Sequence, residues 1–401
     1  MKRGLNPLFS DDASRTRTSP GRSVLAVAVA SLLLAAPGLA AGVLPAGRGM
    51  LGDTGLGQFI IEGLEGILHG AGKLHPPHLC PMPRDVHFII GASGQLGTEF
   101  ALELHRSGER VVLADIKHPT LDALRDLPFV CLDVRDRDVV AVELKRQGAT
   151  HVHHLAAALS ARGEKEPQWA WDLNMRGLLN VLEVAAEHRD IAQVFWPSSI
   201  AVFGPDNGPV AEQNGHRLPE TVYGISKQAG EQWCAWFRKH HGVDTRSVRY
   251  PGLIGELCPP GGGTTDYAVE VFDHLHGAEA YACFLREDTM LPMMHMQDAI
   301  GAMLQITSVE VDRIRNKEAY NIQAMSFDPA TLFAEIRRHV PGFRAEFQPD
   351  FRQAIADGWP DRLDDTAARE DWDWSPTVAL PELVARMVAA KSPALEAEPG
   401  L

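Results

Sequence analysis

A strand, a glycine-rich turn and a helix follow one another directly near residue 90, and this succession limits the fold more than any other feature. The apolar run Val86–Ile90 predicts a short buried strand, Gly91–Gly97 predicts a tight turn, and apolar residues from Phe100 onward predict a helix. Glycines let the backbone approach a pyrophosphate, and the free N–H groups and dipole of the following helix favour an anion. The sequence therefore predicts a dinucleotide-binding unit of a parallel α/β sheet.

An acidic residue ends the next predicted strand. Arg110–Ala114 leads into Asp115, which stands where such folds present an acid to the adenosine ribose hydroxyls. Its charge repels a 2′-phosphate and so favours NAD over NADP, whereas Lys117 is a signal in the other direction. The alternative interpretation of Asp115 is a helix-capping residue in a loop.

Three further strands are predicted, and each ends in residues suited to a ligand. Asp133 ends Phe129–Val134 and is placed to reach an adenine amino group, while Thr150–Ala157 ends in small residues that let a ligand pass close to the backbone. The strand Gln193–Trp196 delivers Ser198 and Ser199 to the sheet edge where open α/β folds bind ligands. The histidines within Thr150–Ala157 alternate between faces and lack partners at ligand spacing, so no metal site is predicted.

Tyr223 and Lys227 are four residues apart and therefore project from one face of a predicted helix. An ammonium beside a phenol favours the phenolate, so a Tyr whose pKa is ordinarily about 10 can act as a base near neutral pH. The alternative is a half-buried ring beside a solvated amine.

Taken together, these features resemble the extended short-chain dehydrogenase/reductase family over roughly residues 84 to 390. Within that family the chain is most similar to the short-chain type of L-threonine 3-dehydrogenases. The similarity is carried by seven blocks: Pro197–Pro205, Tyr223–Glu231, Arg249–Gly252, Pro260–Ala268, Leu291–Met294, Tyr320–Phe327 and Gln353–Pro360.

The resemblance implies oxidation of the C3 hydroxyl of L-threonine by hydride transfer to NAD, giving 2-amino-3-oxobutanoate. It implies that Tyr223 takes the hydroxyl proton, that Lys227 holds the nicotinamide ribose and lowers the pKa of Tyr223, and that Ser199 hydrogen-bonds the same substrate oxygen. A Ser199 that only caps the turn after its strand is the alternative.

Two sets of binding residues follow. Those expected to bind NAD are Gly91, Ser93, Gly94, Gln95, Leu96, Gly97, Asp115, Ile116, Lys117, Asp133, Val134, Leu155, Ala156, Asn174, Tyr223, Lys227 and Leu253. Those expected to contact the substrate are Ser160, Ser199, Tyr223, Gly262, Gly263, Thr264, Thr265 and Trp359.

The glycine-threonine turn at residues 261–265 has a physical reading of its own. Its successive N–H groups and hydroxyls suit a substrate carboxylate, and the alternative is a flexible loop that ends in a capping Thr. Gly358, beside Trp359, stands where the resemblance implies a Ser, which puts one hydrogen bond in doubt.

Composition is typical of a soluble globular enzyme, with 45% hydrophobic and 22% charged residues and a formal charge of −14 that argues against a nucleic-acid surface. Five cysteines without a C-x-x-C pair predict a reduced compartment without a disulfide framework. Cys131 and Cys283 lie in apolar runs and are expected in the core.

The predicted architecture is α/β: a Rossmann-type doubly wound parallel sheet with a smaller C-terminal substrate lobe. Residues 84–250, rejoined by about 293–325, are expected to bind NAD, and residues 251–292 and 326–390 are expected to form the substrate lobe. The resemblance also implies a homodimer packed through helices at 169–187 and about 222–240. Trp233 and Trp236 are expected in that interface or, equally, in the core.

Residues 1–82 are expected to be a leader and linker that contributes no site. A basic segment and the apolar run at 23–44 favour a mitochondrial transit peptide, with a secretory signal or anchor, or a true start at Met82 and a cytoplasmic protein, as alternatives. Pro and Gly residues interrupt the apolar run, so no stable membrane span is expected in the mature enzyme.

Two other functions compete. A nucleotide-sugar epimerase or dehydratase of the same family usually carries an Arg-Asp pair before an aromatic residue and a His, and the corresponding run Leu291–Asp298 lacks that pair. A catalytically silent NAD-binding subunit predicts erosion of the Ser, Tyr and Lys set, and all three residues are present.

Overall fold

The computed structural model of the protein describes residues 85–257 and 259–391. The expected leader and linker at residues 1–82 lie outside the described residues, as do Cys80 and Cys258. No helix in the described part has the length and apolarity needed to cross a membrane.

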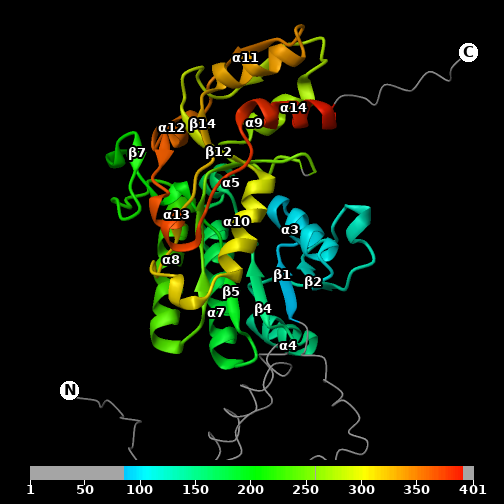
Figure 1. The fold of residues 1–401 in the computed structure, drawn as a ribbon, viewed down its shortest axis with the longest axis vertical. Helices are drawn as coiled ribbons and strands as arrows, with labels where there is room; N and C mark the ends of the chain where they lie inside the picture. Colours follow the sequence, from blue (N-terminus) through cyan, green and yellow to red (C-terminus); the bar gives the residue numbers. More distant parts are fainter. Residues whose placement is uncertain (1–84, 258, 392–401) are drawn as a thin grey trace, which may run out of the picture. The chain divides into compact units, whose positions relative to one another are not determined.

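A six-stranded parallel sheet in the order β3-β2-β1-β4-β5-β8 forms the centre of the larger lobe (Figure 1). Its strands are β1 (Val86–Ile90), β2 (Arg110–Asp115), β3 (Phe129–Cys131), β4 (His151–His154), β5 (Gln193–Phe195) and β8 (Thr245–Arg246). All six carboxyl ends therefore meet at one edge of the sheet, where ligands of open α/β folds bind.

Helices cover both faces of this sheet, because successive residues of each buried strand point to opposite sides. Ile89 packs with α3 (Gln95–Arg106) and α10 (Met296–Ser308). Phe88 and Ile90 pack with the helices of the other face, which are α4 (Arg137–Gln147), α7 (Gly177–Glu187) and α8 (Val222–His241) (Figure 1). The doubly wound prediction is confirmed.

A second, three-stranded sheet extends the first toward the ligand edge. Its strands β6 (Ser198–Ser199), β9 (Val248–Tyr250) and β13 (Tyr320–Asn321) are parallel, with β9 in the middle. β6 begins three residues after β5 ends, and Ser247 alone separates β8 from β9. This extension carries Ser199 past the end of β5.

The smaller C-terminal lobe has its own core, in which Tyr267, Phe272 and Phe333 are fully buried. Its strands are β10 (Gly252–Ile254), β12 (Leu291–His295) and β14 (Met325–Phe327) in one sheet, β11 (Tyr281–Cys283) with β15 (Ala345–Phe347), and β7 (Val210–Ala211) with β16 (Arg362–Leu363).

The remaining α-helices of the described structure, counted over both lobes, are α5 (Ser160–Lys165), α6 (Pro167–Trp171), α9 (Tyr267–Glu270), α11 (Pro329–His339), α12 (Arg352–Asp357), α13 (Thr366–Trp372) and α14 (Leu380–Lys391).

Three local expectations differ from the structure. The fourth strand ends at His154 rather than at Ala157, and the helix expected from residue 169 contains a π-helical turn, Asp172–Arg176, between α6 and α7. Cys131 is exposed, so the expectation that it lies in the core is wrong; it is the last residue of β3, the edge strand of its sheet. Cys283 is buried as expected, and Cys131, Cys234 and Cys283 are all free thiols.

Candidate active site

The glycine turn between β1 and α3 contains two glycines that the protein's own packing requires. Gly91 has a φ of +87°, and a Cβ there would lie 2.5 Å from the Ala156 nitrogen. A Cβ on Gly97 would lie 2.2 Å from the Gly91 oxygen, so α3 packs on β1 only if residue 97 is Gly. A Cβ on Gly94 would come no closer than 3.4 Å to a protein atom, yet Gly94 lines the pocket. Its missing side chain leaves room for a ligand.

Asp115 joins the end of β2 to this turn. Its carboxylate accepts hydrogen bonds from the Ser93 N–H at 3.0 Å and the Lys117 N–H at 3.3 Å. Asp133 is held by Arg135, whose side chain bonds both of its carboxylate oxygens and keeps the pKa of Asp133 below its ordinary value. Both acids line the same pocket.

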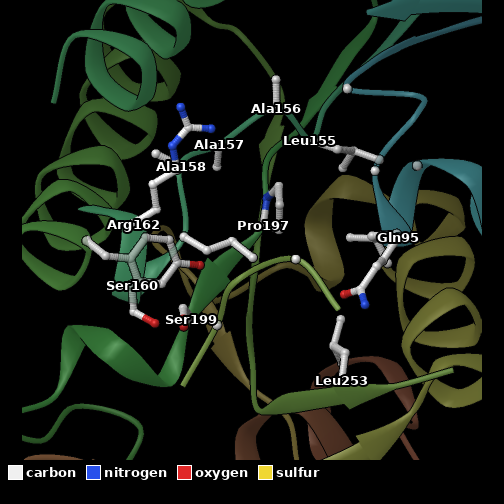
Figure 2. Close-up of a pocket in the computed structure, with 18 of the residues that line it drawn as sticks. Gln95, Leu155, Ala156, Ala157, Ala158, Ser160, Arg162, Pro197, Ser199 and Leu253 are labelled. Atoms are coloured by element: carbon white, nitrogen blue, oxygen red, sulfur yellow. The ribbon is translucent and has the colours of Figure 1, made fainter. Parts of the chain in front are cut away.

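This pocket has a volume of about 470 Å³, within the usual range for small-molecule sites, and is lined by residues of both lobes. Figure 2 shows its lining from close by. In Figure 2, Ser160 and Ser199 lie on one side of Pro197, and Gln95 and Leu253 lie on the other. The pocket brings together all the predicted cofactor and substrate residues except Asn174 and Gly262. Ile116, although 71% exposed, and Trp359 belong to its lining.

Asn174 is buried beside the pocket and supports its wall. Its Oδ1 accepts the Ala158 N–H at 2.7 Å, and its Nδ2 donates to the Ala158 oxygen at 3.2 Å and to Ser226 Oγ at 3.0 Å. Every hydrogen-bonding atom of this amide is thus engaged with the protein. Asn174 orients the chain after β4, and the expectation that it binds the cofactor directly does not fit these contacts.

The helix α8 carries Tyr223 and Lys227 into the pocket. Thr221 caps its first turn by accepting the Gly224 N–H, which fixes where the helix begins. The Lys227 ammonium is 5.5 Å from the centre of the Tyr223 ring and donates a hydrogen bond of 2.6 Å to the Pro197 oxygen. Lys227 thereby also holds the segment that leads to Ser199.

Ser199 both caps its turn and faces Tyr223. Its Oγ accepts the Ala201 N–H at 3.2 Å, so the hydroxyl hydrogen remains available for donation. Ser199 and Tyr223 both line the pocket, and Ser199 acts to lower the pKa of Tyr223. Capping of the turn and a role in catalysis, the two interpretations of Ser199, are therefore compatible with each other.

Burial dominates the electrostatics of the Tyr223 and Lys227 pair. It raises the pKa of Tyr223 to about 12, with Ser199 acting in the opposite direction, and it lowers the pKa of Lys227 to about 7. The expectation that Lys227 lowers the pKa of Tyr223 is wrong for this state of the protein. The ammonium is directed to the Pro197 oxygen, and both side chains have lost their solvation.

The glycine-threonine turn binds a carboxylate of its own chain. The N–H groups of Gly262 and Gly263 donate to Asp266 Oδ2 at 2.7 and 2.8 Å, so they are not free for a substrate. The prediction that they bind the substrate carboxylate is wrong in this conformation. Ser160 Oγ and Thr264 Oγ1 are 3.0 Å apart and buried, and these two hydroxyls remain in the pocket lining.

Sequence reasoning missed two charged residues of the pocket, Asp266 and Arg162. Asp266 is 5% exposed and directly follows the two predicted threonines, so the sequence pattern pointed to its position. The Arg162 guanidinium lies 4.0 Å from the centre of the Trp169 ring and donates to Glu166 at 3.2 Å. No local sequence pattern indicated that Arg162 would line the pocket. Within 85–257 and 259–391, no group of three or more His, Cys, Asp or Glu side chains is arranged to hold a metal ion.

Comparison with known proteins agrees with this geometry. The model of the NAD dependent epimerase/dehydratase family matches residues 87–323. The chain belongs to this family. Its cofactor is NAD, and the room at Gly94 and the carboxylate of Asp115 fit that dinucleotide. Together with the similar L-threonine dehydrogenase structures, the family shows that the chain is an oxidoreductase.

Similar family members include solved structures and a curated relative. The holo form of an L-threonine dehydrogenase from Cupriavidus necator is 51% identical, with a TM-score of 0.73, covering 76% of this chain and 98% of that one. A monomeric L-threonine 3-dehydrogenase from a metagenome is 40% identical over the same shares, also with a TM-score of 0.73. An uncharacterised epimerase/dehydratase from Staphylococcus haemolyticus is 41% identical over 308 residues, covering 75% of this chain and 96% of that protein.

Proposed function

We propose that this enzyme oxidises the C3 hydroxyl of L-threonine to give 2-amino-3-oxobutanoate. The observation that carries the proposal is the composition of one end of the pocket. There a base, Tyr223, and a hydroxyl donor, Ser199, share the lining with the buried hydroxyl pair of Ser160 and Thr264 and with the carboxylate of Asp266. Threonine has one group for each of these features.

The hydroxyl of the substrate meets Ser199 and Tyr223. Ser199 donates its free hydrogen to the substrate oxygen and orients it, and Tyr223 accepts the proton that leaves this oxygen. NAD, when bound, supplies the acceptor of the hydride that leaves C3. Lys227 would hold the nicotinamide ribose when NAD is bound, and through the Pro197 oxygen it also fixes the segment that carries Ser199.

The charged groups of an amino acid meet the other residues. The ammonium is recognised by Asp266, which lines the pocket at its substrate end. The carboxylate accepts hydrogen bonds from the hydroxyls of Ser160 and Thr264, because the N–H groups of the glycine turn are engaged by Asp266. Trp359 lines the same end and covers the substrate.

A nucleotide-sugar epimerase or dehydratase is the second candidate, because the family and the relative from Staphylococcus haemolyticus carry that description. Such a substrate brings a diphosphate that needs cations. Among the described lining residues Arg162 is the only arginine, and it is engaged with Glu166 and Trp169. Pro292 and Met293, in the run without the Arg-Asp pair, are buried residues of β12. This end of the pocket therefore suits a small substrate.

The deciding experiment measures NADH formation from L-threonine, with conversion of UDP-galactose as the comparison. We expect threonine-dependent NADH formation and no epimerisation. An enzyme that converts the nucleotide sugar and leaves threonine untouched would overturn the proposal. A protein that binds NAD but converts neither would favour a silent subunit.

Assembly as a homodimer is a second part of the proposal. The helix α8 exposes Ile225 (43%), Trp233 (38%) and Trp236 (41%), which supports an apolar interface on this helix. Light scattering coupled to size-exclusion chromatography tests it, with Trp233→Ala as the disrupting variant. A wild-type chain that elutes as a monomer, as the metagenome relative is described, would reject the dimer.

We propose that residues 1–82 direct the enzyme to the mitochondrion, on the basis of the basic and apolar segments of the leader. A reporter fused to residues 1–60 tests this. A cytoplasmic or secreted reporter would reject it.

A further inference from the structure

The serine segment, Pro197 to Ser199, is bound to one face of α8 by two hydrogen bonds. The Pro197 oxygen accepts from Lys227 and the Ser198 hydroxyl donates to Glu231, while Ser199 lines the pocket together with Tyr223, one turn before Lys227 on α8. Because positions i, i+4 and i+8 share one helix face, a single stripe of α8 holds the whole serine segment. The proposed function assigns a task to Tyr223, Lys227 and Ser199 but leaves Glu231 without one.

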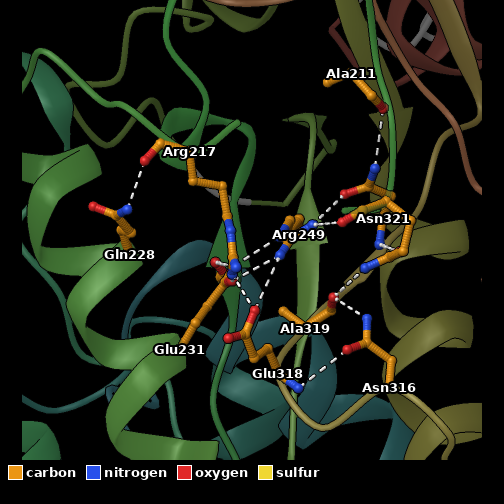
Figure 3. A network of polar contacts seen from close by, with 11 residues as sticks. Ala211, Arg217, Gln228, Glu231, Arg249, Asn316, Glu318, Ala319 and Asn321 are labelled. Atoms are coloured by element: carbon orange, nitrogen blue, oxygen red, sulfur yellow. Dashed lines mark hydrogen bonds and ion pairs between the residues drawn. The ribbon is translucent and has the colours of Figure 1, made fainter. Parts of the chain in front are cut away.

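Glu231 is fully buried, and its carboxylate is held by three side chains, of which Figure 3 labels Arg217 and Arg249. Ser198 Oγ donates to Oε1 at 2.5 Å, Arg249 donates to both oxygens at 2.8 Å, and Arg217 donates to Oε2 at 2.8 Å. Burial alone would raise the pKa of Glu231, but Arg249, Ser198 and Arg217 together hold it below its ordinary value. The carboxylate is therefore a charged and rigid anchor.

The same carboxylate binds two neighbouring strands. Ser198 of β6 is paired with Arg249 of β9, and Ser199 is paired with Tyr250. Arg249 is itself fixed by the Gln213 oxygen at 2.8 Å and by Asn321 Oδ1 at 3.0 Å, which ties β13 into the network (Figure 3). Glu231 thus sets the place of β6 relative to both α8 and β9.

The hydrogen bond from Ser198 to Glu231 matters most for the position of the serine segment once Lys227 contacts the ribose of the cofactor, as the proposed function requires. The Lys227 ammonium then has a second partner besides the Pro197 oxygen, whereas Glu231, the partner of Ser198, is fully buried and is not among the residues that line the pocket. We infer that Glu231 is a positioning residue which, through Ser198, keeps the Ser199 hydroxyl at Tyr223 while the substrate hydroxyl is oxidised. The inference rests on the proposed function.

The test compares two buried serines that are each 2% exposed. Ser198→Ala removes the hydroxyl that donates to Glu231 and leaves the ion pairs in place. Ser247→Ala, on the connection between β8 and β9, is the matched control because the Ser247 hydroxyl has no hydrogen-bond partner. We expect Ser198→Ala to lower kcat for threonine about 10- to 100-fold, with the KM for NAD changed less than twofold, because small displacements of catalytic groups are costly. Ser247→Ala should match the wild type.

A purely structural role would instead lower the melting temperature of Ser198→Ala and leave kcat at temperatures well below it unchanged, and that result would overturn the inference. Glu231→Gln, if it folds, should lower kcat as well, and the double variant should be no slower than the slower single variant, since both changes break one hydrogen bond. If the losses of kcat in the two single variants add up in the double variant, Ser198 and Glu231 do not act through one hydrogen bond.

Failure of the proposed function is distinguishable from failure of this inference. A wild-type enzyme that is inactive on threonine rejects the proposed function. The Ser199 Oγ to Tyr223 Oη distance in crystal structures of the wild type, Ser198→Ala and Ser247→Ala then tests the inference without a substrate. A longer distance in Ser198→Ala alone supports the inference, and equal distances in all three structures reject it.

Discussion

Lys227 donates a hydrogen bond of 2.6 Å to the carbonyl oxygen of Pro197. This ammonium, 5.5 Å from the centre of the Tyr223 ring, is thus directed at the backbone that precedes the two serines. Lys227 is 2% exposed, and burial lowers its pKa to about 7. Within the described structure Lys227 acts on the position of the serine segment more than on the ionisation of Tyr223.

Replacing Tyr223 by Phe should reduce kcat for threonine by about 10²- to 10⁴-fold, because the ring still fits and only the proton acceptor is lost. The dissociation constant of NAD should stay within about twofold of the wild-type value, which fluorescence titration measures. A variant that keeps more than a tenth of the wild-type rate would exclude Tyr223 as the base.

The rate of NADH formation should rise between pH 7 and pH 10. Burial raises the pKa of Tyr223 to about 12, so the ionised fraction that accepts a proton grows with pH throughout this interval. Initial rates at saturating threonine and NAD give the profile. A rate that falls over the same interval would mean that loss of the Lys227 charge, whose pKa burial lowers to about 7, outweighs the ionisation of Tyr223, or that another group is the base.

Asp115→Ala should weaken NAD binding and narrow the preference for NAD over NADP, because the negative charge at the end of β2 is what repels a 2′-phosphate. Lys117→Ala is the matched control on the same loop and should leave that preference for NAD in place. Titrating both dinucleotides into each variant measures the effect. If the wild type prefers NADP, Lys117 rather than Asp115 decides the cofactor.

Thr264→Ala and Thr265→Ala should mainly raise the KM for threonine. A lost hydroxyl donor to a charged carboxylate corresponds to about 1–3 kcal/mol of binding. NAD affinity, measured in parallel, should hardly change. Because the hydroxyls of Ser160 and Thr264 are in buried contact, Ser160→Ala should raise the KM for threonine as Thr264→Ala does. Equal weakening of NAD and threonine would assign this turn to the cofactor.

Glu99→Gln should stabilise the protein most at neutral and alkaline pH. Glu99 on α3 is half-buried near Glu256, its Oε1 has no hydrogen-bond partner, and burial raises its pKa from 4.5 to about 7. A raised folded pKa gives stability that is present below pH 4.5 and is lost as pH rises toward 7, because the unfolded chain releases the proton first. The glutamine side chain has no such proton to lose.

Melting temperatures of wild type and Glu99→Gln between pH 5 and pH 8 test this dependence. The advantage of the variant should grow with pH. Asp138→Asn, which removes an almost fully exposed carboxylate on α4, controls for the change in net charge. A constant difference across the range would show that Glu99 keeps an ordinary pKa.

The sequence by itself determined the strands, turns and helices whose formation depends on neighbouring residues. The apolar run before Gly91, the acid at the end of β2 and the spacing of Tyr223 and Lys227 each follow from neighbouring residues, because strand, turn and helix formation depend on side chains within a few positions. These local signals also indicated where along the chain the pocket residues lie.

The tertiary structure alone decided how those residues use their hydrogen-bonding groups. The N–H groups of Gly262 and Gly263 are engaged by Asp266, the Asn174 amide is engaged by Ala158 and Ser226, and Lys227 is directed to Pro197. Such partners are far apart along the chain or depend on the exact path of a turn, and burial sets the pKa of each ionisable group only when the surrounding elements have packed. Spacing in a sequence shows which groups can meet, and the packed fold decides which of them do.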